Sequence, residues 1–127
     1  MRLLLTRPVA DAARSAAALR ARGHDVVLAP LIRIEPVPAD VGSGASGPWA
    51  AVLITSANAA RAIAAHQRFE ELRVLPVFAV GQHGAEAMRA VGFAGVTSTD
   101  GRGDDLARLV TALMKPGTPL LHLAGAD

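Results

Sequence analysis

Short runs of apolar residues recur along the chain, and most are followed by a turn and then by a stretch with helical periodicity. The first run, Leu3 to Leu5, ends at Thr6-Arg7-Pro8 before apolar residues return at helical spacing from Val9 onward. Runs that are apolar at every position are typical of strands covered on both faces, as in parallel sheets. The alternation therefore predicts an α/β fold with an open parallel sheet flanked by helices, in the manner of a flavodoxin-like lobe.

The same pattern repeats through the rest of the chain. Apolar runs predict further strands at residues 26–28, 50–54, 76–80 and 120–123, with a short strand near Val96. The stretches between them have apolar residues at helical spacing and therefore predict helices. The last helix is expected to begin with Asp104 as its N-cap, because an aspartate carboxylate accepts hydrogen bonds from the first N–H groups of a helix.

Two segments rich in proline and glycine follow the first strand–helix–strand unit. Residues 34–38 (IEPVP) carry two prolines, which disfavours a central strand and indicates an extended connector at a domain boundary. Residues 42–47 (GSGASG) formally satisfy the G-x-G-x-x-G dinucleotide pattern, which normally follows a strand and opens a helix. Here the pattern follows prolines and leads into a strand, so we interpret it as a linker.

The composition limits the function classes. The net charge is +2, and the arginines are scattered without interleaved aromatic residues, which argues against a nucleic-acid partner. The absence of cysteine removes disulfides, thiolate nucleophiles and zinc–thiolate sites, and it is typical of a cytoplasmic protein. The histidines share no metal-binding spacing, so no metal site is predicted, and no apolar stretch is long enough to span a membrane.

In open parallel sheets, ligands bind beyond the carboxyl ends of the strands, where the following helices direct their free N–H groups. The turns that follow the predicted strands are residues 6–8, 55–58, 81–84 and 124–126. They offer hydroxyls, amides and one arginine but almost no carboxylate, so we expect an anionic ligand. Thr55, Ser56 and Asn58 are also common helix-capping residues, and capping alone is an alternative explanation for their type and place.

Several segments, taken together, resemble a known family. Residues 3–8 (LLLTRP), 30–36 (PLIRIEP), 53–59 (LITSANA) and 79–88 (AVG followed by AEAM) occur in the order and spacing of bacterial uroporphyrinogen-III synthases. The chain is similar to the N-terminal half of a typical member. The resemblance implies a two-lobe architecture, with residues 1–35 in one lobe and residues 36–127 in the other. Such a chain would leave apolar sheet edges uncovered, so self-association is expected.

The resemblance also implies an activity. Enzymes of this family are lyases of haem biosynthesis that cyclise hydroxymethylbilane, a linear tetrapyrrole with many acetate and propionate groups, and invert its terminal ring. Loss of water leaves an azafulvene, which the substituted carbon of the terminal ring attacks to form a spiro intermediate. Fragmentation and reclosure then give uroporphyrinogen III. No cofactor or metal takes part, and the main task of the protein is to hold a flexible polyanion in one folded shape.

The motif positions also imply which residues bind the substrate. These residues are Thr6, Arg7, Thr55, Ser56, Asn58, Gly81, Gln82 and His83. Many relatives have a threonine where Gly84 stands, so Gln82 or His83 is expected to replace the missing hydroxyl. No catalytic residue is assigned. The tyrosine often proposed to assist water loss would lie beyond residue 127, and the chain contains no tyrosine, so residues 1–127 alone are expected to be inactive.

The alternative function is a flavodoxin-like or receiver-like module that uses the same turns to bind an anionic small ligand. A receiver would need an aspartate at the end of the third strand, where Thr55 stands. A flavin site would bring aromatic residues to the strand ends, whereas the single tryptophan, Trp49, begins a strand. These differences favour the synthase-like interpretation.

Overall fold

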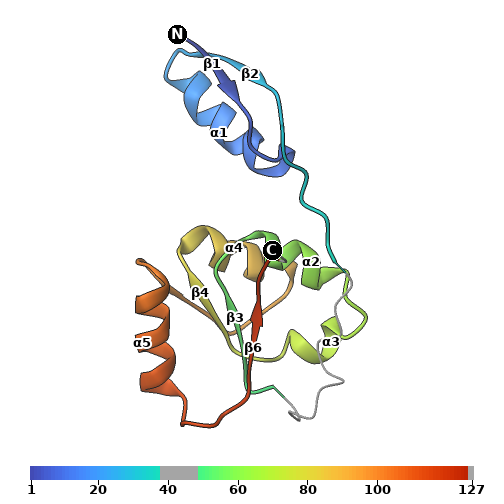
Figure 1. Cartoon of the computed structure of the whole chain (residues 1–127), viewed down its shortest axis with the longest axis vertical. Helices are drawn as coiled ribbons and strands as arrows, with labels where there is room; N and C mark the ends of the chain where they lie inside the picture. Colours follow the sequence, from blue (N-terminus) through green and yellow to red (C-terminus); the bar gives the residue numbers. More distant parts are fainter. Residues whose placement is uncertain (38–48, 126–127) are drawn as a thin grey trace. The chain divides into compact units, whose positions relative to one another are not determined.

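The computed structural model describes residues 1–37 and 49–125, so the predicted linker at residues 42–47 lies outside the described part of the chain. The chain divides into two compact units, Met1–Glu35 and Pro36–Asp127 (Figure 1). Both units are built from parallel strands and helices, which confirms the predicted α/β class with open parallel sheets. None of the helices in the described residues combines the length and the apolar character needed to pass through a lipid bilayer.

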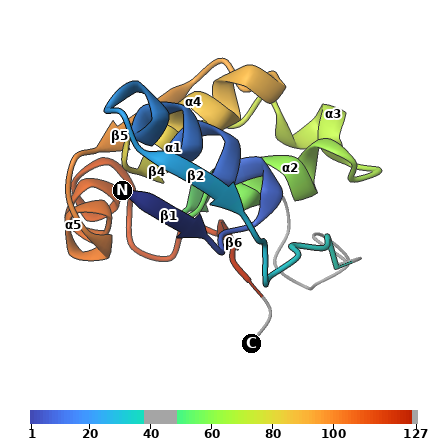
Figure 2. The same ribbon diagram turned by 90° about the horizontal axis from the view of Figure 1, so that it is seen from above.

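The first unit is a β–α–β motif made of β1 (Arg2–Leu5), α1 (Val9–Ala21) and β2 (Asp25–Leu28). Pro8 stands directly before α1 with a φ of −51°, close to the value that its ring imposes, and a proline there removes no helical hydrogen bond. Gly23 follows the helix with a φ of 85°, a conformation that glycine adopts without steric cost. Figure 2 shows β1 and β2 side by side, and their pairing is parallel.

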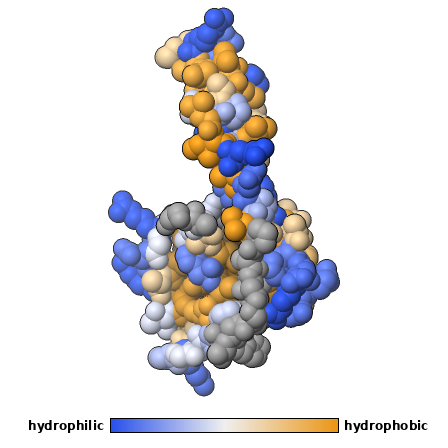
Figure 3. Space-filling view, turned by 45° about the vertical axis from the view of Figure 1, so that its right-hand side comes forward, coloured by the Kyte–Doolittle hydropathy of each residue, from blue (hydrophilic) through white to orange (hydrophobic). Residues whose placement is uncertain are grey.

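Within residues 1–35, one face of this two-stranded sheet is covered by α1. Ala12 and Ala16 of α1 are buried, as is Val26 of β2, which α1 contacts. Leu4 and Val27 are in register on the opposite face, and they are 62% and 44% exposed. Figure 3 shows hydrophobic residues on the surface of this unit. Because a two-stranded sheet with one covered face buries little apolar area, the unit gains little stability from its own core.

The second unit contains a four-stranded parallel sheet in the order β5-β4-β3-β6. Its strands are β3 (Ala51–Ile54), β4 (Val77–Val80), β5 (Val96–Thr99) and β6 (Leu120–Leu123). Its helices are α2 (Asn58–Ala64), α3 (Phe69–Leu72), α4 (Gln82–Val91) and α5 (Gly103–Leu113). Each strand predicted for this unit is therefore present, and β3 and β4 each begin one residue later than predicted.

Helices cover both faces of this sheet. Alternate strand residues point to opposite sides, so Ile54 packs in a hydrophobic cluster with residues of α2 and α4, while Ala51 packs in a second cluster with Leu106 of α5. Figure 1 shows α2 and α5 on opposite sides of the strands. Phe69 and Phe93 add an edge-to-face ring contact beside the first cluster, with centroids 5.8 Å apart. The uninterrupted apolar runs in the sequence are explained by this two-sided burial.

Two details of the helices differ from the sequence predictions. The helix α3 was not predicted, because its four residues are too few to show a helical period. Asp104 is not the N-cap of α5, since the helix begins at Gly103 after the N-cap residue Arg102. The capping carboxylate belongs to Asp105, which accepts a hydrogen bond from the backbone N–H of Arg102 at 2.8 Å. A carboxylate at this third helical position can reach back to the N-cap, whereas the neighbouring one cannot.

Candidate functional site

The parallel pairing of β3 and β4 brings two predicted turns together. Ile54 is in register with Ala79, so both strands end at the same edge of the sheet. Thr55 and Ser56 follow β3 directly and are exposed, and Gly81 follows β4 and is half-buried. Since neighbouring strands lie about 4.8 Å apart, these turns are adjacent. We call this side of the four-stranded sheet, where residues 55–58, 81–83, 99–102 and 124–125 lie, the carboxyl edge.

Ser56 and Asn58 make local hydrogen bonds at the start of α2. The hydroxyl oxygen of Ser56 accepts a hydrogen bond from the backbone N–H of Asn58 at 3.2 Å. The side-chain oxygen of Asn58 accepts a hydrogen bond from the guanidinium of Arg61. The N-cap residue of α2 is Ala57, which makes no side-chain capping bond, so of the three candidate capping residues only Ser56 accepts a bond from a backbone N–H at the start of the helix. Because both oxygens act as acceptors, these two contacts leave the hydroxyl proton of Ser56 and the amide protons of Asn58 able to donate.

The turn between β4 and α4 depends on Gly81. Its φ of 76° and ψ of 155° lie in a region that only glycine adopts readily. The N–H of Gly81 donates to the carbonyl oxygen of Thr99 at 2.7 Å, which ties the turn to β5. The turn then delivers Gln82 and His83, both exposed, as the first residues of α4. The N–H groups in the first turn of a helix have no carbonyl acceptor within the helix, so this turn offers backbone donors at the carboxyl edge.

Gln82 and Gly84 have different environments within α4. The side-chain amide of Gln82 donates a hydrogen bond to the hydroxyl oxygen of Ser98 on β5 at 2.8 Å. Gly84 is buried, and a Cβ atom built on it would lie 3.4 Å from the Cδ1 atom of Ile54. Gly84 therefore allows α4 to approach β3 closely, and the polar side chains that this part of α4 presents at the edge are those of Gln82 and His83.

Thr6 and Arg7 belong to the first unit. They are exposed in the turn between β1 and α1, at the end of β1. The guanidinium of Arg7 donates to the hydroxyl oxygen of Ser15 on α1 at 2.8 Å, and the backbone oxygen of Thr6 accepts a hydrogen bond from the N–H of Leu31 at 3.1 Å. The candidate residues are thus distributed over two sheet edges, one in each unit.

Sequence reasoning missed Asp100 at the carboxyl edge and two residues bonded to side chains of that edge, Arg61 and Ser98. Arg61 was not predicted, although its spacing from Asn58 places the two on one helix face. Ser98 was not predicted, because the strand near Val96 was too short to assign a register. The turn after β5 also brings Asp100 to this edge, so the edge has a carboxylate as well as donors.

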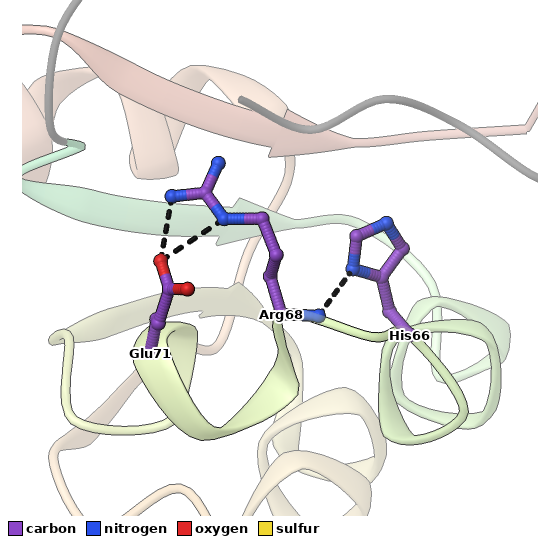
Figure 4. A network of polar contacts seen from close by, with 3 residues as sticks. All are labelled: His66, Arg68 and Glu71. Atoms are coloured by element: carbon purple, nitrogen blue, oxygen red, sulfur yellow. Dashed lines mark hydrogen bonds and ion pairs between the residues drawn. The ribbon is translucent and has the colours of Figure 1, made fainter. Parts of the chain in front are cut away.

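A separate polar network lies between α2 and α3, away from the carboxyl edge (Figure 4). The backbone N–H of Arg68 donates to Nδ1 of His66 at 3.1 Å, and the guanidinium of Arg68 donates to the Glu71 carboxylate at 2.7 Å and 3.0 Å. The hydrogen bond and the positive charge of Arg68 lower the pKa of Glu71 below its ordinary 4.5. This network joins the end of one helix to the start of the next and has no counterpart among the predicted site residues. Within residues 1–37 and 49–125, no group of three or more histidine, cysteine or acidic side chains gathers in a way that could hold a metal ion.

The sequence of the chain was also compared with models of known protein families and with curated proteins. A family model described as uroporphyrinogen-III synthase HemD matches residues 13–127. The matched range contains all candidate residues of the second unit and excludes Thr6 and Arg7. No curated protein sequence matches the chain.

Proposed function

Because the chain belongs to the uroporphyrinogen-III synthase family, we propose that it acts in the cyclisation of hydroxymethylbilane to uroporphyrinogen III. The family match supports a lyase role in tetrapyrrole synthesis. The proposal assigns substrate binding to the carboxyl edge and to the turn that holds Thr6 and Arg7. It needs no cofactor or metal, and it includes a cytoplasmic location.

The observation that carries the proposal is the adjacency of the turns after β3 and β4. Ser56, Asn58 and Gln82 supply neutral hydrogen-bond donors at this edge, and Arg61 adds a positive charge beside Asn58. A substrate with many acetate and propionate groups needs such donors spread over a surface, since each hydrogen bond to a carboxylate is stronger than one between neutral groups. Asp100 would repel a carboxylate, so the proposed contacts run along β3 and β4 and stop short of the turn after β5.

The proposed role of these residues is to position the substrate. Hydroxymethylbilane loses water from its hydroxymethyl group, and the azafulvene that remains is attacked by the substituted carbon of the terminal ring. That attack requires the two ends of a flexible chain to be held together in one orientation, which is the kind of barrier that binding energy lowers. None of the candidate side chains is assigned as a proton donor. We extend the proposal to the two compact units, which would belong to the two lobes of the family architecture.

The test is the isomer distribution of the product. Freshly generated hydroxymethylbilane is supplied to the longest form of the protein that is expressed, and the uroporphyrinogen isomers are separated after oxidation. The expected result is isomer III above the amount in a protein-free control, which closes to isomer I. Isomer I alone would contradict the synthase proposal. In that case, retention of a phosphate or nucleotide would favour the alternative of a flavodoxin-like or receiver-like binding module.

The chain of residues 1–127 is tested separately for binding. We expect it to bind the octacarboxylate uroporphyrin III, followed by porphyrin fluorescence, and to produce no isomer III by itself. Binding depends on the carboxyl edge and on the turn with Thr6 and Arg7, both of which residues 1–127 contain, whereas turnover requires the substrate to be enclosed. Production of isomer III by residues 1–127 would show that our expectation of inactivity is wrong while supporting the proposed function.

A further inference from the structure

The side chains of Gln82 and Ser98 link two neighbouring segments at the carboxyl edge. Ser98 lies on β5 in register with Ala79 of β4, and Gln82 is the first residue of α4, just after Gly81. The Gln82 amide donates to the Ser98 hydroxyl oxygen at 2.8 Å, although the two residues are 16 positions apart in the sequence. This hydrogen bond restrains the conformation of the Gln82 side chain, which is otherwise exposed.

Holding this side chain has an entropic consequence. A free glutamine samples many rotamers, and fixing it in one of them costs conformational entropy. When the fixing is done by Ser98 before a ligand arrives, that cost no longer reduces the affinity for the ligand. A hydroxyl on the neighbouring strand can therefore act on binding without touching the ligand.

The pair also has hydrogen-bonding capacity left over. The Gln82 amide has two N–H bonds, one of which is directed at Ser98, and the Ser98 hydroxyl accepts this bond with its own proton unused. If the amide is turned over, Ser98 donates to the amide oxygen and both N–H bonds are unused. In either orientation the Gln82 amide keeps at least one unused N–H bond and carries no net charge, so it can donate to a carboxylate oxygen.

We infer that Ser98 is a positioning residue, which holds the Gln82 amide in place to donate to one acetate or propionate carboxylate of the tetrapyrrole. The inference rests on the proposed function and extends it to β5, a strand that the sequence predictions left out of the site.

The experiment measures the dissociation constant of uroporphyrin III by porphyrin fluorescence for a set of variants. Ser98→Ala is expected to weaken binding roughly three- to tenfold, which is the size of one hydrogen bond. Gln82→Ala should weaken it by a similar or larger factor, and Gln82→Glu by at least about tenfold because it sets like charges against each other. The double variant should bind no more weakly than Gln82→Ala, because Ser98 acts only through Gln82.

Two further variants serve as controls. Thr97→Ala removes an exposed hydroxyl from the same strand on the opposite face of the sheet, and it should leave binding unchanged. Ser98→Thr keeps the hydroxyl and should retain most of the affinity. The NMR signals of the Gln82 side-chain amide report the restraint directly, and in Ser98→Ala they should become those of a mobile amide even without ligand.

The outcomes separate the inference from the proposed function. Wild-type affinity in both Ser98→Ala and Gln82→Ala, with uroporphyrin III still bound, would overturn the inference and leave the function standing. Independent, additive losses from the two variants would also overturn it, because Ser98 would then act without Gln82. If the unaltered protein neither binds uroporphyrin III nor produces isomer III, the proposed function itself fails, and the inference fails with it.

Discussion

At the scale of single residues, Gly81 fixes the geometry of the carboxyl edge through its backbone. A Cβ atom built on Gly81 would meet nothing within 4 Å, so a substitution there is opposed only by the positive φ. Gly81→Ala should therefore destabilise the protein by about 1–3 kcal/mol, measured by urea unfolding. Gly103→Ala is the matched control, because its Cβ also enters open space and its φ lies outside the region that favours glycine. Equal stabilities of the two variants would contradict this account of the turn.

Glu71 has a lowered pKa in the folded protein, and this makes its contribution to stability depend on pH. Its pKa is lowered by the hydrogen bond from Arg68 and by the charge of Arg68, so the folded protein binds this proton less readily than the unfolded chain. The stabilisation is therefore present above pH 4.5 and is lost as the pH falls through the lower pKa of the folded state. A carboxyl ¹³C titration should show that Arg68→Gln raises the pKa of Glu71 toward 4.5.

Arg73 provides the comparison for this titration. It forms an ion pair with Glu70 and not with Glu71, so Arg73→Gln should leave the Glu71 titration in place. A pKa of Glu71 that responds equally to both substitutions would mean that general charge, and not the contact with Arg68, causes the shift. Because the side chain is exposed, added salt should also weaken the effect.

At the scale of elements, the start of α5 distinguishes two adjacent aspartates. Asp105 accepts a hydrogen bond from the N–H of Arg102 and lies 3.4 Å from the guanidinium of Arg108, whereas Asp104 is exposed in the first turn. Asp105→Ala should cost about 1 kcal/mol in unfolding free energy, and Asp104→Ala only a few tenths. Thermal unfolding of both variants checks this, and a larger loss from Asp104→Ala would restore the sequence-based assignment of the N-cap.

The sequence was sufficient for the elements whose apolar pattern is unambiguous. The runs that became β3 and β4 were predicted because burial on both faces leaves every position apolar, and Gly92 was correctly expected at the end of α4, where its φ is 119°. Which strands lie next to each other could not be predicted from the sequence, since the order β5-β4-β3-β6 depends on contacts between distant segments. This is why Ser98 was missed, although the turn that holds Gln82 was predicted.

The predicted site residues show the same limit. Thr55, Ser56 and Gly81 were chosen because they follow apolar runs, and the parallel register of β3 and β4 makes them neighbours. Their substrate contacts stay a prediction. Local sequence could not distinguish a cap from a ligand contact at Ser56, because one hydroxyl can accept the hydrogen bond from Asn58 and still donate its own proton.

At the scale of the whole molecule, the uncovered face of the β1–β2 sheet is the feature with the clearest consequence. Leu4 and Val27 lie in register on this face and are 62% and 44% exposed, and within residues 1–37 and 49–125 each of the two strands pairs only with the other. Exposed apolar faces and unpaired strand edges favour association. We therefore expect the chain to self-associate with increasing concentration, which sedimentation velocity measures.

A charged residue on this face should weaken the association, because each partner would have to bury it. Leu4→Lys is expected to shift the protein toward the monomer at concentrations where the unaltered chain associates, by roughly tenfold or more in the dissociation constant. Val74→Lys is the matched control, since Val74 is a 75% exposed valine of the second unit, outside the β1–β2 sheet. If the unaltered chain stays monomeric at all concentrations, or if Val74→Lys dissociates it as effectively as Leu4→Lys, the β1–β2 face is not the contact. A chain that stays monomeric would mean that a small sheet with one exposed apolar face is stable in water. An equal effect of Val74→Lys would mean that the four-stranded unit forms the contact.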